Sequence, residues 1–195
     1  MGTALGAGLT GAVRGVVLRP VQAQDASTID AFVRNLSPQS RQRRFHGGVV
    51  QLPPALLHLF THPDPRHEMA LLAFSTQAGR EVCVGEARYA VTEESPCERE
   101  FALAVADGWQ GMGIGSRLLR SLTRHAQRHG VERLFGDVLR DNLPMIALAQ
   151  SLGYCVGRHP AEARLLRVAK TLAKSVQCGP AFRGSGAAVA AAIEA

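Results

Sequence analysis

Three glycines at alternate positions, Gly111, Gly113 and Gly115, stand directly in front of an amphipathic run in the stretch ADGWQGMGIGSRLLRSL. The first backbone N–H groups of a helix lack partners inside the helix, and the helix dipole favours negative charge there. Glycines allow an anion to come close to these main-chain groups. The pattern therefore predicts a site for a phosphate-bearing ligand at the start of a helix.

Two well-known phosphate loops do not match this stretch. A Walker loop needs G-K-[ST] after its glycines, and none follows Gly115. A dinucleotide-binding loop needs a third glycine where Ser116 stands, and it belongs after a first strand rather than past the middle of the chain. A nucleotide-binding Rossmann protein stays as an alternative that affinity for NAD would reveal.

The elements that position this loop can be read from periodicity and turn residues. EFALAVA, before the glycines, is a short apolar strand, and IGSRLLRSLTRHAQRHG, after them, carries its apolar residues on one face of a helix. Further helices are expected over 25–36, from Ser37 onward, within 53–65 and over 142–154, with Ser37 and Asn142 suited to be N-caps. Further strands are expected over 15–20, 69–75, 82–91, 132–139 and 164–172.

Length and composition bound the class of protein. The 195 residues, 46% of them hydrophobic, fit one domain, placed at 14–174 between a flexible N-terminus (1–13) and a mobile Ala/Gly-rich tail (175–195). No apolar run approaches the roughly 20 residues that span a bilayer, and no export or anchoring signal is recognised. We therefore expect a soluble, cytoplasmic protein without a membrane partner. The net charge of +6 comes from scattered cations with few aromatic residues between them, so no nucleic-acid partner is expected.

Cysteine and histidine spacing does not support a metal site. The four cysteines are far apart in the sequence: Cys83, Cys97, Cys155 and Cys178. Without a C-x-x-C pair they are expected to be free thiols. His125 and His129 lie four residues apart, but no third ligand is evident, so no metal is expected.

Gln110, Gly113 and Gly115 make the pattern Q-x-x-G-x-G, which resembles the pyrophosphate loop for acetyl-CoA in the GNAT acetyltransferase superfamily. The resemblance runs through LRPVQAQDA, LSPQSRQRRF, EFALAVADGWQGMGIGSRLL and RDNLPMIALAQSLGY, over about residues 16–170. LSPQSRQRRF and EFALAV are similar to the acetyltransferase domains of bacterial Pat-type protein lysine acetyltransferases. The resemblance implies a single α/β (α+β) domain with a mixed, mostly antiparallel sheet flanked by helices.

The resemblance also implies where acetyl-CoA would bind. The backbone of Leu103, Ala104 and Val105 is expected beside the pantetheine arm, with the Val105 N–H on the thioester carbonyl. The loop residues expected at the diphosphate are Gln110, Gly111, Met112, Gly113, Ile114, Gly115 and Ser116. Asn142 matches a family asparagine that contacts the cofactor, although the same residue type is common as a plain helix cap.

Direct transfer of an acetyl group to an amine requires removal of a proton from the amine. A lysine amine has a reference pKa near 10.4, so only roughly one in 10³ is unprotonated at neutral pH. Pat-type proteins place a catalytic glutamate in a similar EFA context, which implies Glu100 as the base, with Glu98 in reserve. Partial burial is expected to raise the pKa of Glu100, or a water to relay the proton. A solvated carboxylate at the end of a strand is the plain structural interpretation.

The sequence departs from the common family pattern at Ala149, where many GNAT enzymes place a tyrosine that protonates the departing thiolate. Tyr154 falls where the family usually has an aromatic packing residue, so no general acid is assigned. Arg41, Arg43 and Arg44 form either a solvated helix face or part of the acceptor cleft. Trp109 is expected to pack beside the loop.

The resulting prediction is an N-acetyltransferase that uses acetyl-CoA and no metal, acting as a monomer or homodimer. Its acceptor is a primary amine, with a protein lysine favoured over a small polyamine-like amine. A non-catalytic sensor that binds acyl-CoA is the alternative from another functional class.

Overall fold

The computed structural model describes residues 15–47, 49–92, 95 and 97–172, so the expected termini 1–13 and 175–195 lie outside the described residues. The strands are β1 (Val16–Pro20), β2 (Met69–Gln77), β3 (Arg80–Val91), β4 (Glu98–Val105), β5 (Arg133–Leu139), β6 (Cys155–Arg158) and β7 (Leu165–Thr171). The α-helices are α1 (Ala26–Asn35), α2 (Pro38–Phe45), α3 (Pro54–Thr61), α4 (Ile114–Arg128) and α5 (Leu143–Ser151). Two short 3-10 turns are η1 (Ala23–Asp25) and η2 (Asp107–Trp109).

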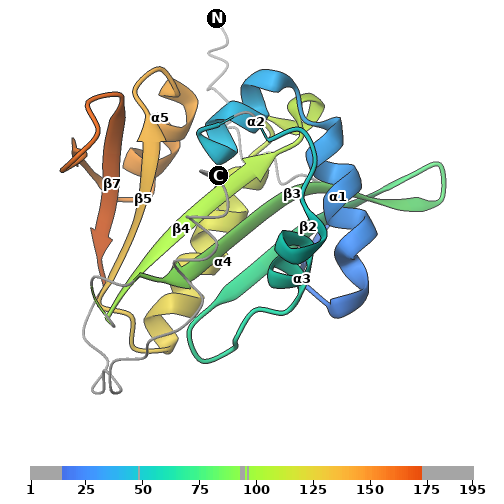
Figure 1. Ribbon diagram of the computed structural model, residues 1–195, viewed down its shortest axis with the longest axis horizontal. Helices are drawn as coiled ribbons and strands as arrows, with labels where there is room; N and C mark the ends of the chain where they lie inside the picture. The colour runs from blue at the N-terminus through green and yellow to red at the C-terminus, as the bar shows by residue number, and fades with distance from the viewer. Residues whose placement is uncertain (1–14, 48, 93–94, 96, 173–195) are drawn as a thin grey trace, which may run out of the picture.

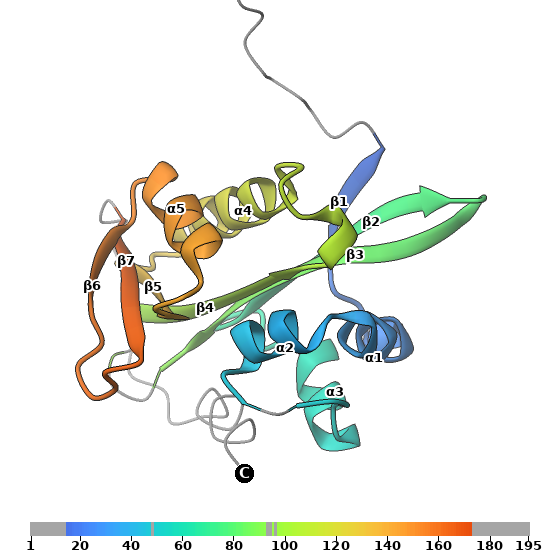
Figure 2. The same cartoon turned by 90° about the horizontal axis from the view of Figure 1, so that it is seen from above.

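The strands form one sheet in the order β1-β2-β3-β4-β5-β7-β6. Neighbouring strands are antiparallel except β4 and β5, which run parallel. Helices α4 and α5 cover one face of the sheet, and α1, α2 and α3 cover the other (Figures 1 and 2). This arrangement confirms the predicted mixed, mostly antiparallel sheet flanked by helices.

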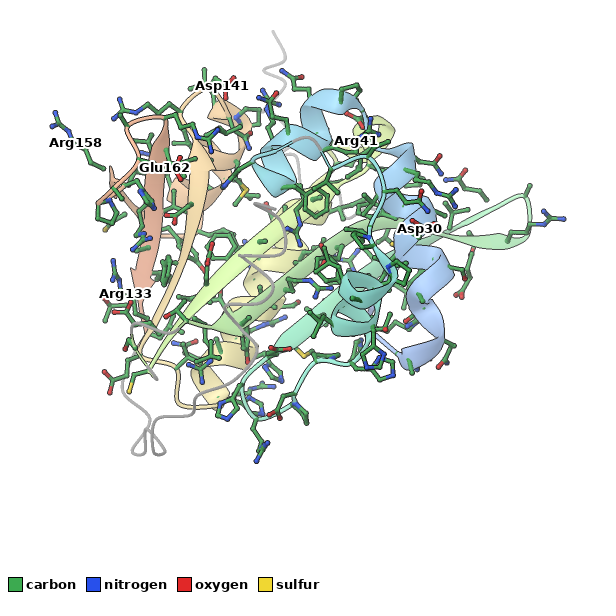
Figure 3. The ribbon with its side chains drawn as sticks, viewed as in Figure 1. Asp30, Arg41, Arg133, Asp141, Arg158 and Glu162 are labelled. Atoms are coloured by element: carbon green, nitrogen blue, oxygen red, sulfur yellow. The ribbon has the colours of Figure 1, made fainter. Side chains whose placement is uncertain are left out.

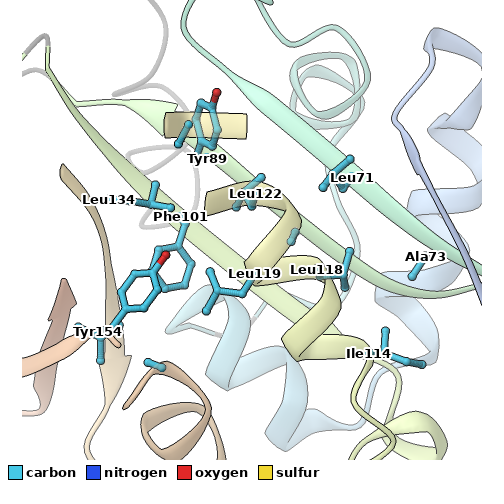
Figure 4. Packing of buried hydrophobic residues seen from close by; sticks show 14 of the residues in the cluster. Leu71, Ala73, Tyr89, Phe101, Ile114, Leu118, Leu119, Leu122, Leu134 and Tyr154 are labelled. Carbon is cyan, nitrogen blue, oxygen red and sulfur yellow. The ribbon is translucent and has the colours of Figure 1, made fainter. Parts of the chain in front are cut away.

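Helix α4 is held on the sheet by the apolar face that its sequence pattern predicted. Ile114, Leu118, Leu119 and Leu122 are at most 1% exposed and pack over the sheet beside Phe101 of β4 (Figure 4). Fully burying a side chain of this size stabilises the fold by about 1.5–3 kcal/mol. This packing fixes the start of α4 directly after the glycine loop.

The opposite face of the sheet has a separate apolar core. Ile29 and Phe32 of α1 pack there with Leu56 and Phe60 of α3 against Leu72 of β2. Helix α2 begins as expected, because the Ser37 hydroxyl accepts a hydrogen bond of 3.1 Å from the Ser40 backbone N–H, and Pro38 fills the first helical position. This core and cap hold α2 over β4.

All the helices and strands expected from the sequence are present, with ends that differ by a few residues. Strand β6 was not foreseen. It is only four residues long, its side chains are mostly exposed, and it lies at the edge of the sheet. Without an alternation of buried and exposed residues, such a strand leaves no pattern to read.

The cysteine prediction is partly wrong. Cys83 and Cys155 are free thiols, but Cys97 is joined in a disulfide. Cys178 lies outside the described residues. Spacing along the chain excludes close-pair motifs only, because folding can join half-cystines from distant segments.

The described part of the chain lacks two kinds of feature. None of its helices combines the length and the apolar character that crossing a bilayer requires. Within the same residues, no three or more His, Cys, Asp or Glu side chains are grouped so that they could hold a metal ion.

Candidate active site

The sheet opens between its two parallel strands. β4 pairs with β5 only along Glu98–Glu100, opposite Arg133–Phe135, although both strands continue beyond these pairs. Gly136 stands where the strands separate, since a Cβ there would lie 2.9 Å from the Phe101 carbonyl oxygen. From this fork the two ribbons diverge toward α2 and α5 (Figure 1).

The fork turns main-chain groups of β4 toward the opening. The Phe101 carbonyl faces β5, as its closeness to Gly136 shows. Successive residues of a strand alternate in direction, so the backbone groups of Leu103 and Val105 face the same way. Beyond Glu100 these groups have no pairing with β5. The open end of the fork can therefore receive a ligand with its own hydrogen-bonding groups along β4.

A pocket of about 340 Å³ occupies the open end of the fork. Its walls come from both faces of the sheet: α2 from one face, and the start of α4 with α5 from the other. Ten of the site residues expected from the sequence line it, namely Leu103, Ala104, Val105, Gln110, Gly111, Gly113, Ile114, Gly115, Ser116 and Asn142. Met112 and Glu100 do not line it, and Met112 is 46% exposed.

The glycine loop has the backbone conformation that its sequence suggested. Gly111 and Gly113 have φ angles of 74° and 83°, in the left-handed region that favours glycine. Gly113 is the N-cap of α4, and no side chain caps this end of the helix. The first N–H groups of α4 are thus available to an anion in the pocket.

A network of side chains ties this loop to α2. The Asp107 carboxylate accepts hydrogen bonds from the Ser37 backbone N–H at 2.9 Å and from the Ser37 and Ser40 hydroxyls at 2.7 Å each. Gln110 Nε2 donates to the Val105 carbonyl at 3.0 Å and to Ser40 Oγ at 3.2 Å. Gln110 therefore holds the loop against β4 and α2 through its amide nitrogen.

Hydrogen bonding sets the charge state of Asp107. Burial by itself would raise the pKa of the Asp107 carboxyl, but the hydrogen bonds from Ser37 and Ser40 outweigh it and hold the pKa below its usual value. The carboxylate is thus ionised at neutral pH, and it fixes the N-terminus of α2 beside the loop.

A buried ion triad supports the other part of α2. Arg44 Nε and Nη2 donate to Glu86 Oε2 at 3.2 and 3.1 Å, and Arg88 Nε donates to the second oxygen of Glu86. The three side chains are at most 8% exposed. Burial would raise the pKa of Glu86, but Arg44 and Arg88 outweigh it and lower the pKa. The Arg88 guanidinium also lies 3.5 Å from the centre of the Phe60 ring.

Glu100 sits at the last residue pair before the fork opens, opposite Ala90 of β3 and Phe135 of β5. It is half-buried. Because Phe101 faces α4, its neighbour Glu100 lies on the side of the sheet covered by α2. Glu100 is therefore placed at the base of the fork, outside the pocket lining.

The reserve carboxylate, Glu98, is already paired. Both of its oxygens accept from Arg133 Nη1 at 3.2 Å. Arg133 begins β5 at the end of the strand opposite Asp141, as Figure 3 shows, so this pair lies at the closed end of the fork. Its position is two residues further from the pocket than that of Glu100.

Tyr154 is packed away from the pocket, in agreement with its interpretation as a packing residue. It is 3% exposed, its hydroxyl hydrogen-bonds Thr123 Oγ1 at 2.8 Å, and its ring meets Phe101 edge-on. Burial raises the pKa of Tyr154 to about 12. Ala149, at the position where many family members have tyrosine, is fully buried in the same core.

Asn142 has two roles in the structure. Its Oδ1 accepts a hydrogen bond of 3.4 Å from the Met145 N–H at the start of α5, as a cap does, and the residue also lines the pocket. The plain helix cap and the ligand-facing residue are thus both compatible with its position.

The sequence left the place of some lining residues open and missed others. Arg43 and Arg44, weighed between a solvated face and the acceptor cleft, line the pocket, and so does Trp109, which was expected beside the loop. The lining residues that were missed are Ser40, Pro144, Met145 and Leu148. The spacing of Ser40, Arg43 and Arg44 at i, i+3 and i+4 shows that they share a helical face, but it does not show what that face meets. Arg41 does not line the pocket; it donates to the backbone carbonyls of Arg34 and Leu36.

Comparisons with known proteins agree with this geometry. The model of the acetyltransferase (GNAT) family matches residues 39–154. The acetyltransferase PA5475 of Pseudomonas aeruginosa is 34% identical over 148 residues, which cover 75% of this chain and 78% of that protein. The acetyltransferase Pat of Mycolicibacterium smegmatis is 30% identical over 137 residues, or 70% of this chain, but the match spans only 40% of that relative.

Solved structures show the same fold. The GNAT domain of S. lividans PAT superposes with a TM-score of 0.70 at 28% identity, covering 80% of this chain and 89% of that one. The structure of yncA from Salmonella typhimurium with its cofactor acetyl-CoA has a TM-score of 0.69 at 17% identity, covering 86% of this chain and all of that one. The forked sheet, the Q-x-x-G-x-G loop and these matches show that the chain belongs to the GNAT acetyltransferase family, with similarity to Pat-type members, as the sequence motifs indicated.

Proposed function

We propose that this protein transfers the acetyl group of acetyl-CoA to a primary amine, and that the amine belongs to a protein lysine. The observation that carries this proposal is the pocket at the fork, which joins an anion-binding helix start to open main-chain groups of β4. Such a pocket suits a ligand with a diphosphate at one end and an amide-bearing arm behind it. The cofactor of the yncA structure has this form, and we carry it over from there.

Acetyl-CoA would place its diphosphate on the first N–H groups of α4, at the loop 110–116. Its pantetheine arm would follow the backbone of Leu103, Ala104 and Val105. The Val105 N–H, which faces the fork, would donate to the thioester carbonyl and to the oxyanion that forms during transfer. Asn142 would contact the arm from α5.

Glu100 is the proposed base. Its side of the sheet is the side of α2, whereas the start of α4 lies on the opposite side, so donor and acceptor would approach the fork from opposite faces. A carboxylate at the base of the fork can accept the proton of the amine directly or through a water. The elevated pKa expected of Glu100 stays a prediction.

The lysine acceptor is supported by the similarity to the two Pat proteins, and small polyamine-like amines are the competing acceptors. Because acetyl-CoA is the proposed cosubstrate, we place the enzyme in the cytoplasm. The proposed chemistry requires no metal. Because Tyr154 is buried and residue 149 is an alanine, neither position supplies a tyrosine acid to the departing thiolate. A thiol with a pKa of about 8.5 can depart without such an acid.

The test combines binding and turnover in the same samples. Calorimetry with acetyl-CoA should give binding for the wild type and for Gly108→Glu, a control at an open position of the preceding turn, and none for Gly113→Glu. Thiol release with a lysine peptide should fall by about 10² to 10⁴-fold in Glu100→Gln, since a positioned base contributes by this factor. Glu98→Gln is the matched control and should keep its activity.

Each failure has its own meaning. Binding without thiol release, with either the peptide or a polyamine, would identify a non-catalytic acyl-CoA sensor. Thiol release with the polyamine but not with the lysine peptide would show that the acceptor is a small amine and not a protein lysine. A wild type that binds NAD and no CoA thioester would contradict the proposed function as a whole.

A further inference from the structure

The wall that α2 contributes to the pocket carries two guanidinium groups. Ser40, Arg43 and Arg44 lie on one helical face, and all three line the pocket. Ser40 is the residue bonded to Gln110 of the glycine loop. An α-helix rises 1.5 Å per residue, so Arg43 begins about 4.5 Å further along α2 from the loop. Arg44 reaches Glu86, the residue of β3 that pairs with Ala104 of β4, so its guanidinium lies beside the strand segment proposed for the pantetheine arm.

The two arginines differ in their partners. Arg44 donates two hydrogen bonds to Glu86, a carboxylate that it shares with Arg88. Arg43 has no hydrogen bond or ion pair with any residue that the structure describes, and its Nε is closed off from solvent. A buried donor without an acceptor is unfavourable, particularly on a charged group. The covered Nε does not face the pocket, but the terminal nitrogens of Arg43 also have no acceptor among the described residues. Because Arg43 lines the pocket, a ligand there can be their acceptor.

The described lining of this end of the pocket carries positive charge and no carboxylate of its own. Among the described residues that line it, the charged side chains are Arg43 and Arg44, and none is a carboxylate. Glu86 carries one negative charge against the two positive charges of Arg44 and Arg88. A second anionic group of the ligand is therefore favoured beside Arg43, at a distance from the diphosphate.

We propose that Arg43 binds a carboxylate of one of the two substrates at the reacting end of the pocket. A guanidinium matches a carboxylate with two parallel hydrogen bonds, and the diphosphate already has the free N–H groups at the start of α4 as donors. The inference rests on the proposed function. The carboxylate belongs either to the far end of a dicarboxylic acyl group on CoA or to the acceptor that carries the amine.

The donor source is tested with succinyl-CoA and butyryl-CoA, which have acyl chains of equal length and differ in a terminal carboxylate against a methyl group. If the acyl group supplies the carboxylate, the wild type should bind succinyl-CoA about tenfold more tightly in calorimetry, as expected for one charge-assisted pair. Arg43→Gln should remove this preference. Arg34→Gln, which removes a charge from an exposed position on α1, should retain it.

The acceptor source is tested with acetyl-CoA as donor and two amines that differ only in a carboxylate, Nα-acetyl-lysine and its N-methylamide. If the acceptor supplies the carboxylate, KM for the acid should be about tenfold lower than KM for the amide in the wild type, and equal to it in Arg43→Gln. Thermal unfolding should be unchanged in Arg43→Gln, because Arg43 bonds no other described residue.

A preference in either arm that depends on Arg43 supports the proposal and identifies the source. This inference, but not the proposed function, is overturned if acetyl-CoA binds normally while succinyl-CoA binds no more tightly than butyryl-CoA and the acid and amide acceptors have equal KM. It is also overturned if Arg43→Gln weakens acetyl-, butyryl- and succinyl-CoA by one common factor, since Arg43 would then hold the diphosphate. Failure of the wild type to bind any CoA thioester overturns the proposed function and this inference together.

Discussion

The two ends of the pocket are built from different parts of the chain. At the loop end, the groups that face the pocket are main-chain N–H groups between Gly111 and Ser116. At the α2 end, they are side chains: Ser40, Arg43 and Arg44, two of which are held by partners 42 and 67 residues away. The first kind of site depends on local conformation and the second on long-range packing, so they should respond differently to mutation.

The largest effect is expected from the packing that holds the α2 end. Glu86→Ala leaves Arg44 and Arg88 buried without their shared counter-ion, and removal of one partner from such a group costs about 3–5 kcal/mol. Urea denaturation measures this loss. Glu81→Ala, an exposed position on the same strand, is the control and should be nearly neutral. A loss below about 1 kcal/mol would mean that the triad does not anchor α2.

At the loop end, mutation should lower the free energy of unfolding through backbone strain and not through lost side-chain contacts. Gly113→Ala forces a side chain into a φ of 83°, which costs about 1–2 kcal/mol although the added Cβ meets no atom. Gly108→Ala is equally open but not at a positive φ, so it should leave the free energy of unfolding unchanged. Equal effects of the two variants in urea denaturation would contradict the role assigned to the left-handed conformation.

Asp107 joins the two ends, and its removal should have a moderate effect. Asp107→Asn weakens three hydrogen bonds to Ser37 and Ser40, and since the carboxylate is exposed we expect a loss of about 1 kcal/mol. A double-mutant cycle with Ser40→Ala should show coupling both in stability and in acetyl-CoA affinity. Additive effects on affinity would show that the two ends act independently.

The smallest expected effect is a pH dependence of the free energy of unfolding that comes from Asp107. The pKa of Asp107 is lowered in the folded protein, so its contribution is present above the pKa of the unfolded chain, near 3.9, and is lost as pH falls through the folded value. The difference in unfolding free energy between wild type and Asp107→Asn should be constant above about pH 5 and shrink below about pH 4. A difference that persists at about pH 2.5 would exclude this ionisation as its source.

The same contrast explains what could be read from the sequence. The loop, α4 and the order of the elements follow local patterns, and so do ten of the lining residues. For Arg43 the sequence left a solvated helix face and the acceptor cleft open, and it gave no sign of Ser40, because a polar helical face does not show which element it meets. The role of Glu86 as the shared counter-ion of Arg44 and Arg88 could not be predicted, because a carboxylate within an apolar strand does not indicate which arginines it pairs with. Edge strand β6 was missed because four mostly exposed residues leave no periodic pattern, and the disulfide of Cys97 was missed because no local motif around that residue indicates a bond.

The short pairing between β4 and β5 makes the sheet two leaves joined at one corner. β1 to β4 form one leaf and β5 to β7 the other, and within the described strands three register pairs join β4 to β5. In deuterium exchange, the amides of Leu103 and Val105 should lose protons faster than those at the joined corner, and they should slow when a ligand bridges the leaves. A molecule bound in the fork would thus act as the missing strand, and the sheet would be continuous only while it is occupied.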